Sequence, residues 1–455
     1  MGRHRGQPLT LGATLLAALL MLLFLVAAAC SHTAQLSVDQ GSGAQPLLPA
    51  PSHSLLPTVH IAPAIGWSDG ERPRAARGLQ VDAFARDLVH PRWLQVLPDG
   101  DVLVAETNAP ARPQDAPGLR GWIMRHIMSR AGATTPSADR ITLLRDADGN
   151  GIAERRSVFV AGLHSPFGMV LVGDQFYVAD TDAVLRFPYT DGAMQIDAAP
   201  TKLLDLPAGS INHHWTKNLI ADPSGERLYV TVGSNSNVAE NGLPAEEGRA
   251  AIWQVDRATG AHRLFATGLR NPNGLAWDDT GTVLWTVVNE RDELGSDLVP
   301  DYLTSVRDGG FYGWPWSYYG QHVDTRVQPP RPDNVAAALV PDYALGPHTA
   351  ALGLVSARGT RLPEPYRNGV FVGEHGSWNR QPFSGYRVVF VPFRDGRPAG
   401  PAIEVLGGFL SDTGRAHGRP VGLAVDRTGA LLVADDVGNV VWRVSAAPAS
   451  ASAAP

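Results

Sequence analysis

Six times along the chain, a polar turn is followed by a run of alternating apolar residues. The six stretches are Leu97–Thr107, Val172–Tyr189, Pro223–Asn235, Asp278–Arg291, Tyr366–Trp378 and Asp426–Val444. Each combines turn residues with Val, Leu, Ile or aromatic side chains in alternation, which is the pattern of a β-strand. Another short apolar strand precedes most of them, so the repeated unit is strand, turn, strand.

These units recur at intervals of roughly 50 to 90 residues, which is typical of propeller blades with loop insertions. We therefore predict an all-β chain that folds as a six-bladed β-propeller over residues 61–446. A pair of β-sandwiches is the alternative, since short strands with regular turns also permit it. The propeller is favoured because the segments SPFG, HHWTKN, RNPNG and GRPVG each precede an inner strand. Such loops converge on one face of a propeller.

Composition limits the partners that this chain can have. Its 48 glycines and 36 prolines in 455 residues favour short strands with tight turns over long helices. The formal net charge is only -6 and no basic stripe is present, so we do not expect nucleic acid as a partner. A small neutral ligand fits this composition better. The single cysteine, Cys30, lies near the N-terminus, which excludes a disulfide framework and a thiolate metal site in the body of the chain.

The N-terminus has the features of a targeting segment. A positively charged start precedes the apolar run Leu9–Ala29, which predicts an export signal or a membrane anchor over residues 1–30. Cys30 follows three alanines and resembles the lipidated cysteine of bacterial lipoproteins, so lipidation, an uncleaved anchor and a cleaved signal all stay open. We interpret residues 31–60 as a flexible linker and 447–455 as a disordered tail. The protein is then expected to be exported, periplasmic and tethered to the membrane.

Two of the loops ahead of inner strands carry residues suited to catalysis. His214 stands shortly before the strand that begins near Leu219, where an imidazole can act as a general base near neutral pH. Arg270 and Asn271 place a fixed cation and an amide beside a proline-stiffened turn, which suits holding an anion or a carbonyl. A structural histidine and an arginine that bridges two blades are the alternatives.

Two acidic segments are candidates for binding calcium. Asp292 and Glu293 lie in a crowded acidic loop with glycine and proline, a composition that supplies oxygen ligands, although it also suits a solvated loop. Asp146, Asp148 and Asn150 match the start of a calcium loop in type and spacing. The glutamate expected at the twelfth position is absent from that second segment, and an Asx-rich turn explains it equally well.

The last two blades add further polar residues ahead of their strands. These are His375, Asn379, Arg380, His417 and Arg419. A face that presents three arginines, including Arg270, would attract a ligand with several negative charges, and nearby aromatic rings would stack on a flat one. A planar polycarboxylate meets both demands. Exposed arginines paired with surface carboxylates are the alternative.

Five motifs together carry a family resemblance. They are HHWTKNLIADPSGERLYVTVGS, GLRNPNGLAWD, VNERDELGSDL, GEHGSWNR and GRPVGLAVD. In this order they resemble the glucose/sorbosone dehydrogenase family, whose members are six-bladed propellers that use pyrroloquinoline quinone (PQQ). The resemblance runs from about Leu88 to Val444 and is nearest to the sorbosone and pyranose dehydrogenase-like branch.

The resemblance implies a role for each site residue. His214 matches the base that removes the hydroxyl proton of the substrate, Arg270 the arginine that polarises a cofactor carbonyl, and Asn271 its neighbour on the cofactor. Cofactor carboxylates would be bound by Arg419, with His417 in place of a second arginine and Asn379 or Arg380 in place of a lysine. Calcium would bind the backbone carbonyls of Asp292 and Glu293.

The sequence therefore predicts a PQQ- and Ca²⁺-dependent oxidoreductase that oxidises a sugar or a sugar-derived aldehyde and passes electrons to a quinone or a cytochrome. Two alternatives stay open. The first is a calcium-dependent lactonase, which needs metal-binding side chains on the propeller axis and leaves the arginines unexplained. The second is a non-catalytic carbohydrate-binding propeller, which would not depend on His214.

Overall fold

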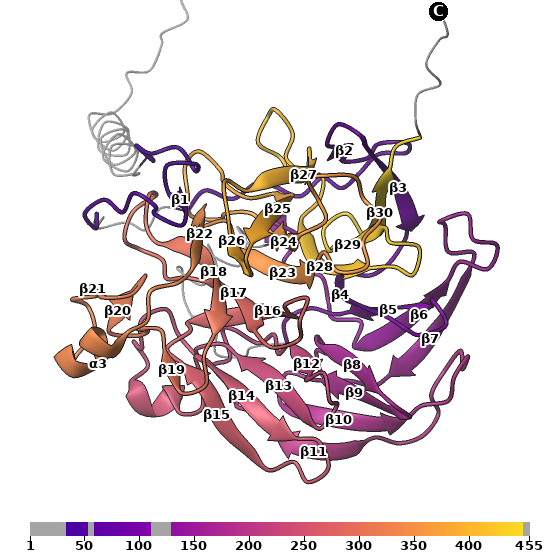
Figure 1. The fold of residues 1–455 in the computed structure, drawn as a ribbon, viewed down its shortest axis with the longest axis horizontal. Helices are drawn as coiled ribbons and strands as arrows, with labels where there is room; N and C mark the ends of the chain where they lie inside the picture. Colours follow the sequence, from indigo (N-terminus) through magenta and orange to yellow (C-terminus); the bar gives the residue numbers. More distant parts are fainter. Residues whose placement is uncertain (1–32, 53–58, 111–128, 449–455) are drawn as a thin grey trace, which may run out of the picture.

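The structure is a computed structural model that describes residues 33–52, 59–110 and 129–448. Its strands form six sheets of at least four strands, antiparallel apart from one added strand, arranged around an axis as the blades of a propeller (Figure 1). Each of the six stretches predicted from the sequence falls in a different blade. The all-β, six-bladed propeller is therefore confirmed.

The first three blades follow one another along the chain. Blade 1 consists of β4 (Pro91–Val96), β5 (Val102–Glu106), β6 (Arg140–Arg145) and β7 (Arg155–Ala161). Blade 2 consists of β8 (Met169–Val172), β9 (Gln175–Ala179), β10 (Ala183–Pro188) and β11 (Thr201–Asp205). Blade 3 consists of β12 (Leu219–Ala221), β13 (Arg227–Val232), β14 (Ala251–Asp256), β15 (His262–Thr267) and the parallel β19 (Gly310–Phe311).

Segments from the N-terminal part of the chain join the other three blades. Blade 4 consists of β16 (Asn271–Trp277), β17 (Leu284–Asn289), β18 (Pro300–Val306), β22 (Tyr343–Pro347) and β1 (Ser42–Gly43). Blade 5 consists of β23 (Ala351–Ser356), β24 (Gly369–Glu374), β25 (Arg387–Arg394), β27 (Ile403–Gly407) and β2 (Arg74–Ala75), with β26 (Arg397–Pro398) on β25. Blade 6 consists of β28 (Pro420–Val425), β29 (Leu431–Asp435), β30 (Val440–Ala446) and β3 (Leu79–Ala85).

The pairing of β3 with β30 closes the ring. Val81 lies opposite Val444 and Leu79 opposite Ala446, so the first strand of the propeller completes its last blade. The loops outside the blades contain the hairpin of β20 (Ser317–Tyr318) and β21 (His322–Val323), the helix α3 (Pro332–Ala337) and the 3₁₀ turn η1 (Leu243–Glu246).

Apolar side chains fill the space between neighbouring blades. On blades 1 and 2, the rings of Trp93 and Phe167 lie 5.0 Å apart, and Trp215 stands edge-on to Phe167 at 6.1 Å. The guanidinium of Arg92 lies 5.8 Å from the Phe167 ring and 5.7 Å from the Trp215 ring. This aromatic packing fixes the position of a charged group next to the axis.

Glycines allow the innermost strands to approach one another closely. A Cβ atom at Gly422 would lie 2.6 Å from the carbonyl oxygen of Arg92 on blade 1, and one at Gly274 would lie 2.6 Å from the backbone nitrogen of Leu354 on blade 5. Gly168 and Gly353 stand in the same way against the inner strands of blades 3 and 6. The recurring glycine of SPFG, NPNG and RPVG is thus explained by packing between blades.

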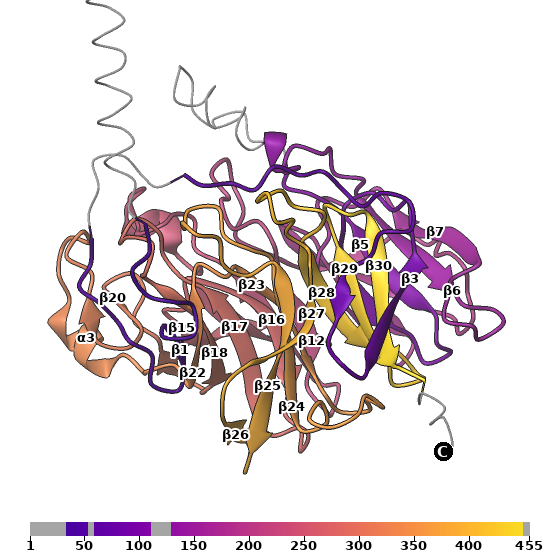
Figure 2. The ribbon, with the colours of Figure 1, turned by 90° about the horizontal axis from the view of Figure 1, so that it is seen from above.

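The N-terminal segment is bonded to the propeller and corrects the predicted flexible linker. The backbone nitrogens of Gln35 and Leu36 donate to the Asp297 carboxylate at 2.7 and 3.2 Å, and β1 pairs with β22. The backbone nitrogen of His60 donates to the Trp378 carbonyl at 2.8 Å, and the imidazole ring of His60 stacks on the Phe383 ring at 3.9 Å. In Figure 2 this indigo segment runs along one side of the ring.

Several sequence predictions fall on residues that the structure does not describe. The predicted signal or anchor, with Cys30, and most of the predicted C-terminal tail lie outside the described residues. Within the described ranges, no helix has the length and apolar character required to cross a membrane.

We predict that Gly422→Ala destabilises the propeller by about 3 kcal/mol, because backbone atoms of Arg92 and Trp93 on blade 1 lie within 3 Å of the new methyl group. Thermal unfolding followed by circular dichroism measures the change. Gly396→Ala is the control, since no atom lies within 4 Å of its Cβ position and only its left-handed φ of 72° costs about 1 kcal/mol. Equal losses in the two variants would contradict the packing argument.

Candidate functional site

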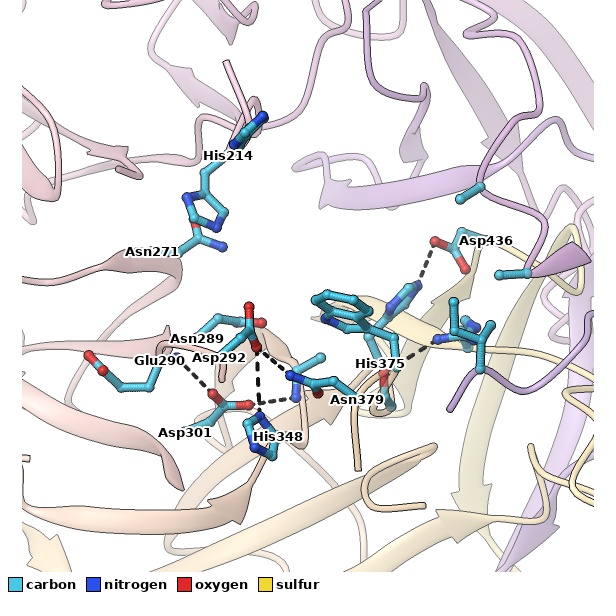
Figure 3. Close-up of a pocket in the computed structure, with 18 of the residues that line it drawn as sticks. His214, Asn271, Asn289, Glu290, Asp292, Asp301, His348, His375, Asn379 and Asp436 are labelled. Carbon is cyan, nitrogen blue, oxygen red and sulfur yellow. Dashed lines mark hydrogen bonds and ion pairs between the residues drawn. The ribbon is translucent and has the colours of Figure 1, made fainter. Parts of the chain in front are cut away.

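Loops of blades 1, 3, 4, 5 and 6 line one polar cavity of about 430 Å³ near the propeller axis (Figure 3). The cavity is lined by segments up to 376 residues apart in the chain, from Ile61 to Val437. Six of the residues predicted from the sequence line it: His214, Arg270, Asn271, Asp292, Asn379 and Arg419. The propeller therefore brings most of the predicted site together.

The His214 imidazole is held so that one ring nitrogen can accept a proton. Its Nδ1 lies 2.8 Å from the carbonyl oxygen of Ser234. Because a carbonyl only accepts hydrogen bonds, we assign the proton to Nδ1, which leaves the lone pair on Nε2. Burial and then the nearby Arg270 hold the pKa of His214 well below 6.5, so the ring is neutral at physiological pH.

Buried polar contacts fix the loop that carries His214. The Lys217 ammonium lies 3.2 Å from the His214 carbonyl oxygen, and the Thr181 hydroxyl donates to the Trp215 carbonyl at 2.9 Å. Asn212 lies below the cavity, where it donates to Thr181 at 2.8 Å and accepts from Arg249 at 3.0 Å. The loop is therefore preorganised by the scaffold.

Arg270 and Asp292 form an ion pair on the cavity wall. One guanidinium nitrogen of Arg270 lies 3.2 Å from Asp292 Oδ2, and another donates to the Glu290 carbonyl at 2.7 Å. Asn379 Nδ2 donates to Asp292 Oδ1 at 2.6 Å. Figure 3 shows Asn271 beside His214, and a Cβ at Gly233 would lie 2.5 Å from His214 Cβ and against Asn271 Oδ1. Gly233 thus leaves room for both side chains.

The predicted calcium ligands of this loop do not fit a metal ion. The Asp292 carbonyl oxygen already accepts from the Arg326 guanidinium at 3.0 Å and from Asn237 Nδ2 at 3.3 Å. A carbonyl that binds a cation in this way is a poor ligand for a second, doubly charged one. Glu293 is exposed and does not line the cavity. The group that Asp292 presents to the cavity is its carboxylate.

Arg380 and His417 have structural roles that correct their predicted place at the cofactor. Arg380 is 1 % exposed and donates to the carbonyls of Ser296, Pro382 and Leu36 at 2.8 to 3.1 Å. His417 Nδ1 lies 3.1 Å from the Gly66 carbonyl, and its ring stacks on Trp67 at 5.0 Å. Neither lines the cavity, because the N-terminal segment occupies the space beside them.

The second predicted calcium segment forms the β6–β7 turn at the outer end of blade 1, away from the cavity. Asp146 accepts hydrogen bonds from the backbone nitrogens of Gly149, Asn150 and Gly151, as in an Asx-rich turn. Glu154 joins Asp146 and Asp148, with one oxygen of each within 4.8 Å of the others. Sequence reasoning missed Glu154 because it stands at the ninth position and not the twelfth.

A second group of polar and charged residues lies across the cavity, and of its members only His375 was predicted from the sequence. Asp436 binds Arg92 at 2.5 Å and His375 Nε2 at 2.9 Å, while His90 Nε2 lies 3.7 Å away. Burial opposes ionisation, yet these neighbours hold the pKa of Asp436 well below its ordinary value. Asp436 directly follows β29, and a polar residue at the end of a buried strand was the available signal.

His348 and Asp301 also line the cavity without having been predicted. His348 Nδ1 lies 3.7 Å from Asp292 Oδ1. Asp301 accepts from the backbone nitrogens of Glu290 and Ala350 at 2.8 and 2.6 Å, and burial raises its pKa to about 7. The Asp301 carboxyl is thus partly protonated at neutral pH.

The cavity lining fits a flat ligand that offers an anionic group to Arg419 and hydrogen-bond donors to the oxygens of two asparagines. Arg419 makes no ion pair with any described residue, and its Nε is buried without a partner there, as are Asn271 Oδ1 and Asn379 Oδ1. Trp378 is 36 % exposed and lines the cavity, where its ring can stack on a flat molecule. Small-molecule sites typically have volumes of about 300–1,000 Å³, a range that includes this cavity.

Comparisons with known proteins agree with this description. Among curated proteins, a PQQ-dependent pyranose dehydrogenase of Coprinopsis cinerea is 26% identical over 360 residues, which cover 70% of this chain and 44% of that protein. An uncharacterized protein of Borreliella burgdorferi is 28% identical over 242 residues, 52% of this chain and 62% of that one. The chain therefore spans less than two thirds of the length of these relatives.

Solved structures share the fold at low sequence identity. The Trichoderma reesei carbohydrate-active enzyme of family AA12 superposes with a TM-score of 0.67 at 18% identity, covering 85% of this chain and 99% of that one. The holo form of the pyranose dehydrogenase PQQ domain of Coprinopsis cinerea gives 0.65 at 21% identity, covering 84% and 100%. The resemblance to PQQ-dependent sugar dehydrogenases, predicted from the motifs, is confirmed.

Two family descriptions match the chain. Residues 332–447 match a family described as TrAA12-like. Residues 74–377 match a family described as a domain of unknown function, DUF7133, and this match takes in blades 1 to 4 and the first half of blade 5. Since it covers more than half of the sequence, the chain belongs to the DUF7133 family.

Proposed function

We propose that this protein is a PQQ-dependent oxidoreductase that oxidises a sugar or a sugar-derived aldehyde. The observation that carries the proposal is the cavity in which His214, the Arg270–Asn271 pair and Arg419 meet from blades 3, 4 and 6. These residues supply a neutral base, a fixed cation with an amide, and an arginine without a carboxylate partner. The names of the pyranose dehydrogenase relatives support the same reaction class.

Side chains on two sides of the cavity would hold the cofactor. Arg270 and Asn271 would bind one edge, and Arg419 with Asn379 the other. When bound, PQQ supplies a quinone carbonyl that accepts hydride. The guanidinium of Arg270 is held by Asn237, Asp292 and the Glu290 carbonyl, so its charge would polarise a nearby carbonyl from a fixed position. Trp378 would cover a face of the flat ring system.

His214 would take the proton of the substrate hydroxyl at Nε2. The Ser234 carbonyl keeps Nδ1–H in place during this step, so the imidazole keeps its orientation as it becomes charged. The neighbouring Arg270 disfavours a long-lived imidazolium, which favours release of the proton after each turnover. The base is therefore neutral and ready at the start of each cycle.

No step is assigned to calcium, because the predicted carbonyl ligands do not fit it. The Asp292 carboxylate faces the cavity but already binds Arg270 and Asn379. The lactonase alternative needs free carboxylates for a metal on the axis, and the same pairing disfavours it. Export, tethering by residues 1–30 and electron transfer to a quinone or cytochrome remain parts of the proposal that rest on the sequence.

We predict that His214→Gln retains PQQ binding but lowers kcat for sugar oxidation by about 10²–10⁴-fold, because the variant has no proton acceptor at this position. The full chain is reconstituted with PQQ in Ca²⁺ and in EDTA, and absorbance reports binding while a dye acceptor reports turnover. Wild type must bind PQQ and oxidise at least one aldose or sorbosone. A wild type that binds PQQ without turnover would support the carbohydrate-binding alternative, and one that binds no PQQ would reject the proposal.

Lys217 gives a test of how the His214 loop is held. Its side chain is fully buried, and burial lowers its pKa well below 10.5. The unfolded chain then binds more protons than the folded one between the folded pKa and 10.5, so folding stability rises with pH across that window. The cost of burying this ammonium is greatest at lower pH and disappears above 10.5.

We predict that Lys217→Met removes this part of the pH dependence. Relative to the variant, wild type should gain up to about 1.4 kcal/mol of stability per pH unit within the window. Urea unfolding at several pH values from 7 to 10 measures the difference. The variant should also lose activity, because the bond from Lys217 to the His214 carbonyl is absent. Parallel stability curves for the two proteins would show that the buried ammonium stays charged.

A further inference from the structure

We propose that the His375–Asp436 pair is a hydroxyl-binding subsite, in which His375 Nδ1 accepts a hydrogen bond from a substrate hydroxyl other than the one that is oxidised. The inference rests on the proposed function and narrows its substrate class to polyhydroxylated molecules. It concerns the wall of the cavity opposite His214, where the sequence motifs include His375 but assign no specific role to it or to Asp436.

One ring nitrogen of His375 is held by a hydrogen bond, and the other is available to a ligand. His375 Nε2 lies 2.9 Å from Asp436 Oδ2, and Asp436 is in turn held by Arg92 at 2.5 Å. A carboxylate only accepts, so Nε2 carries the proton and Nδ1 keeps its lone pair. No residue in the described ranges donates a hydrogen bond to Nδ1. The His375 side chain is 20 % exposed and lines the cavity.

The surroundings keep this imidazole neutral and make it a good acceptor. Burial lowers the pKa of His375 to about 4 against the opposing effect of Asp436, and Arg419 and Arg92 act in the same direction as burial. The lone pair is therefore free at neutral pH. A carboxylate behind the N–H group also raises the basicity of the opposite ring nitrogen, as it does for histidines that bind metals.

These features select the chemistry of the ligand group. A lone pair requires a donor, which excludes a carboxylate or a carbonyl oxygen as the bound group. An ammonium group is disfavoured because Arg92 and Arg419 lie close by. A neutral hydroxyl meets both conditions.

The position of the pair separates it from the proposed base. Figure 3 shows His375 and Asp436 on the opposite side of the cavity from His214 and Asn271. A hydroxyl bound at His375 is therefore not the one whose proton His214 removes. A single-hydroxyl alcohol could satisfy one of the two sites but not both.

The first experiment measures the histidine directly and does not depend on turnover. The full chain is labelled with ¹⁵N-histidine, and His375→Leu assigns the His375 resonances by their loss. Nε2 should be protonated and Nδ1 bare, and titration with monosaccharides should shift Nδ1. A proton on Nδ1, or no shift with any sugar up to saturating concentration, would overturn the inference.

The second experiment is a kinetic cycle with sugars that wild type oxidises. Removal of one particular hydroxyl in a monodeoxy sugar should lower kcat/KM of wild type by about tenfold, the effect of one lost hydrogen bond. His375→Leu should lower kcat/KM for the parent sugar by a similar factor and show no further loss with that deoxy sugar. Equal losses with every deoxy sugar in both proteins would contradict the subsite.

Two further variants complete the design. His164→Gln is the matched control, because His164 forms a similar pair with Asp182 at 2.8 Å, but on the surface and outside the cavity lining. Its kcat/KM should equal that of wild type for every sugar. Should His375→Leu fail to fold, Asp436→Asn replaces it, with an expected smaller loss confined to the same hydroxyl. If no sugar is oxidised, the proposed function fails, while the ¹⁵N measurement still decides the subsite.

Discussion

The close contact between inner strands around the axis is the constraint on which the site depends. Where Gly168, Gly274, Gly353 and Gly422 stand, the backbone of the next blade takes the place of a side chain. At these four blade junctions, the contact fixes one inner strand against the next to within the size of a methyl group. The loops ahead of those strands can therefore place side chains from distant parts of the sequence around one cavity of about 430 Å³.

Within that cavity, two histidines are oriented by the same physical device. His214 donates a hydrogen bond from Nδ1 to a backbone carbonyl, and His375 donates one from Nε2 to a carboxylate. Each ring is left with one lone pair, but the partners differ in charge. His214, with a neutral carbonyl partner and cations nearby, is a weak base that releases a bound proton readily. The carboxylate partner of His375 makes the opposite ring nitrogen a stronger hydrogen-bond acceptor. The difference suits the first histidine to proton transfer and the second to binding.

The sequence predicted the architecture and the part of the site that depends on local position. Strand alternation and repeated turns identify six blades, and the start of an inner strand gives the location of His214, Arg270 and Arg419 without knowledge of their neighbours. The family resemblance supplied their roles. These residues lie in the cavity because their place relative to a strand is fixed by the blade itself.

The remainder depended on contacts between distant segments that leave no periodic signal. Arg380 and His417 stand at predicted ligand positions, but Arg380 bonds to Leu36 and His417 to Gly66. Leu36 lies in the segment that composition indicated as a linker, and the position of Gly66 beside the last blade left no signal in the sequence. The Asp292 carbonyl is likewise unavailable to a metal ion, because it accepts a hydrogen bond from Arg326 in the loop after β21. Asp436 was missed because its partners, Arg92 and His375, belong to two other blades.

The distribution of charge connects the cofactor and the substrate. Arg92 is neutralised by Asp436 and Arg270 by Asp292, whereas Arg419 has no carboxylate partner among the described residues and lies 4.8 Å from the Tyr386 ring. The cavity thus offers an anion one guanidinium that is not neutralised by an ion pair, in agreement with its assignment to a cofactor carboxylate. On the wall of blades 1 and 6, the paired charges leave hydrogen-bonding capacity without net charge. An anionic substrate would gain no ion pair there, so a neutral polyhydroxylated one is the better complement.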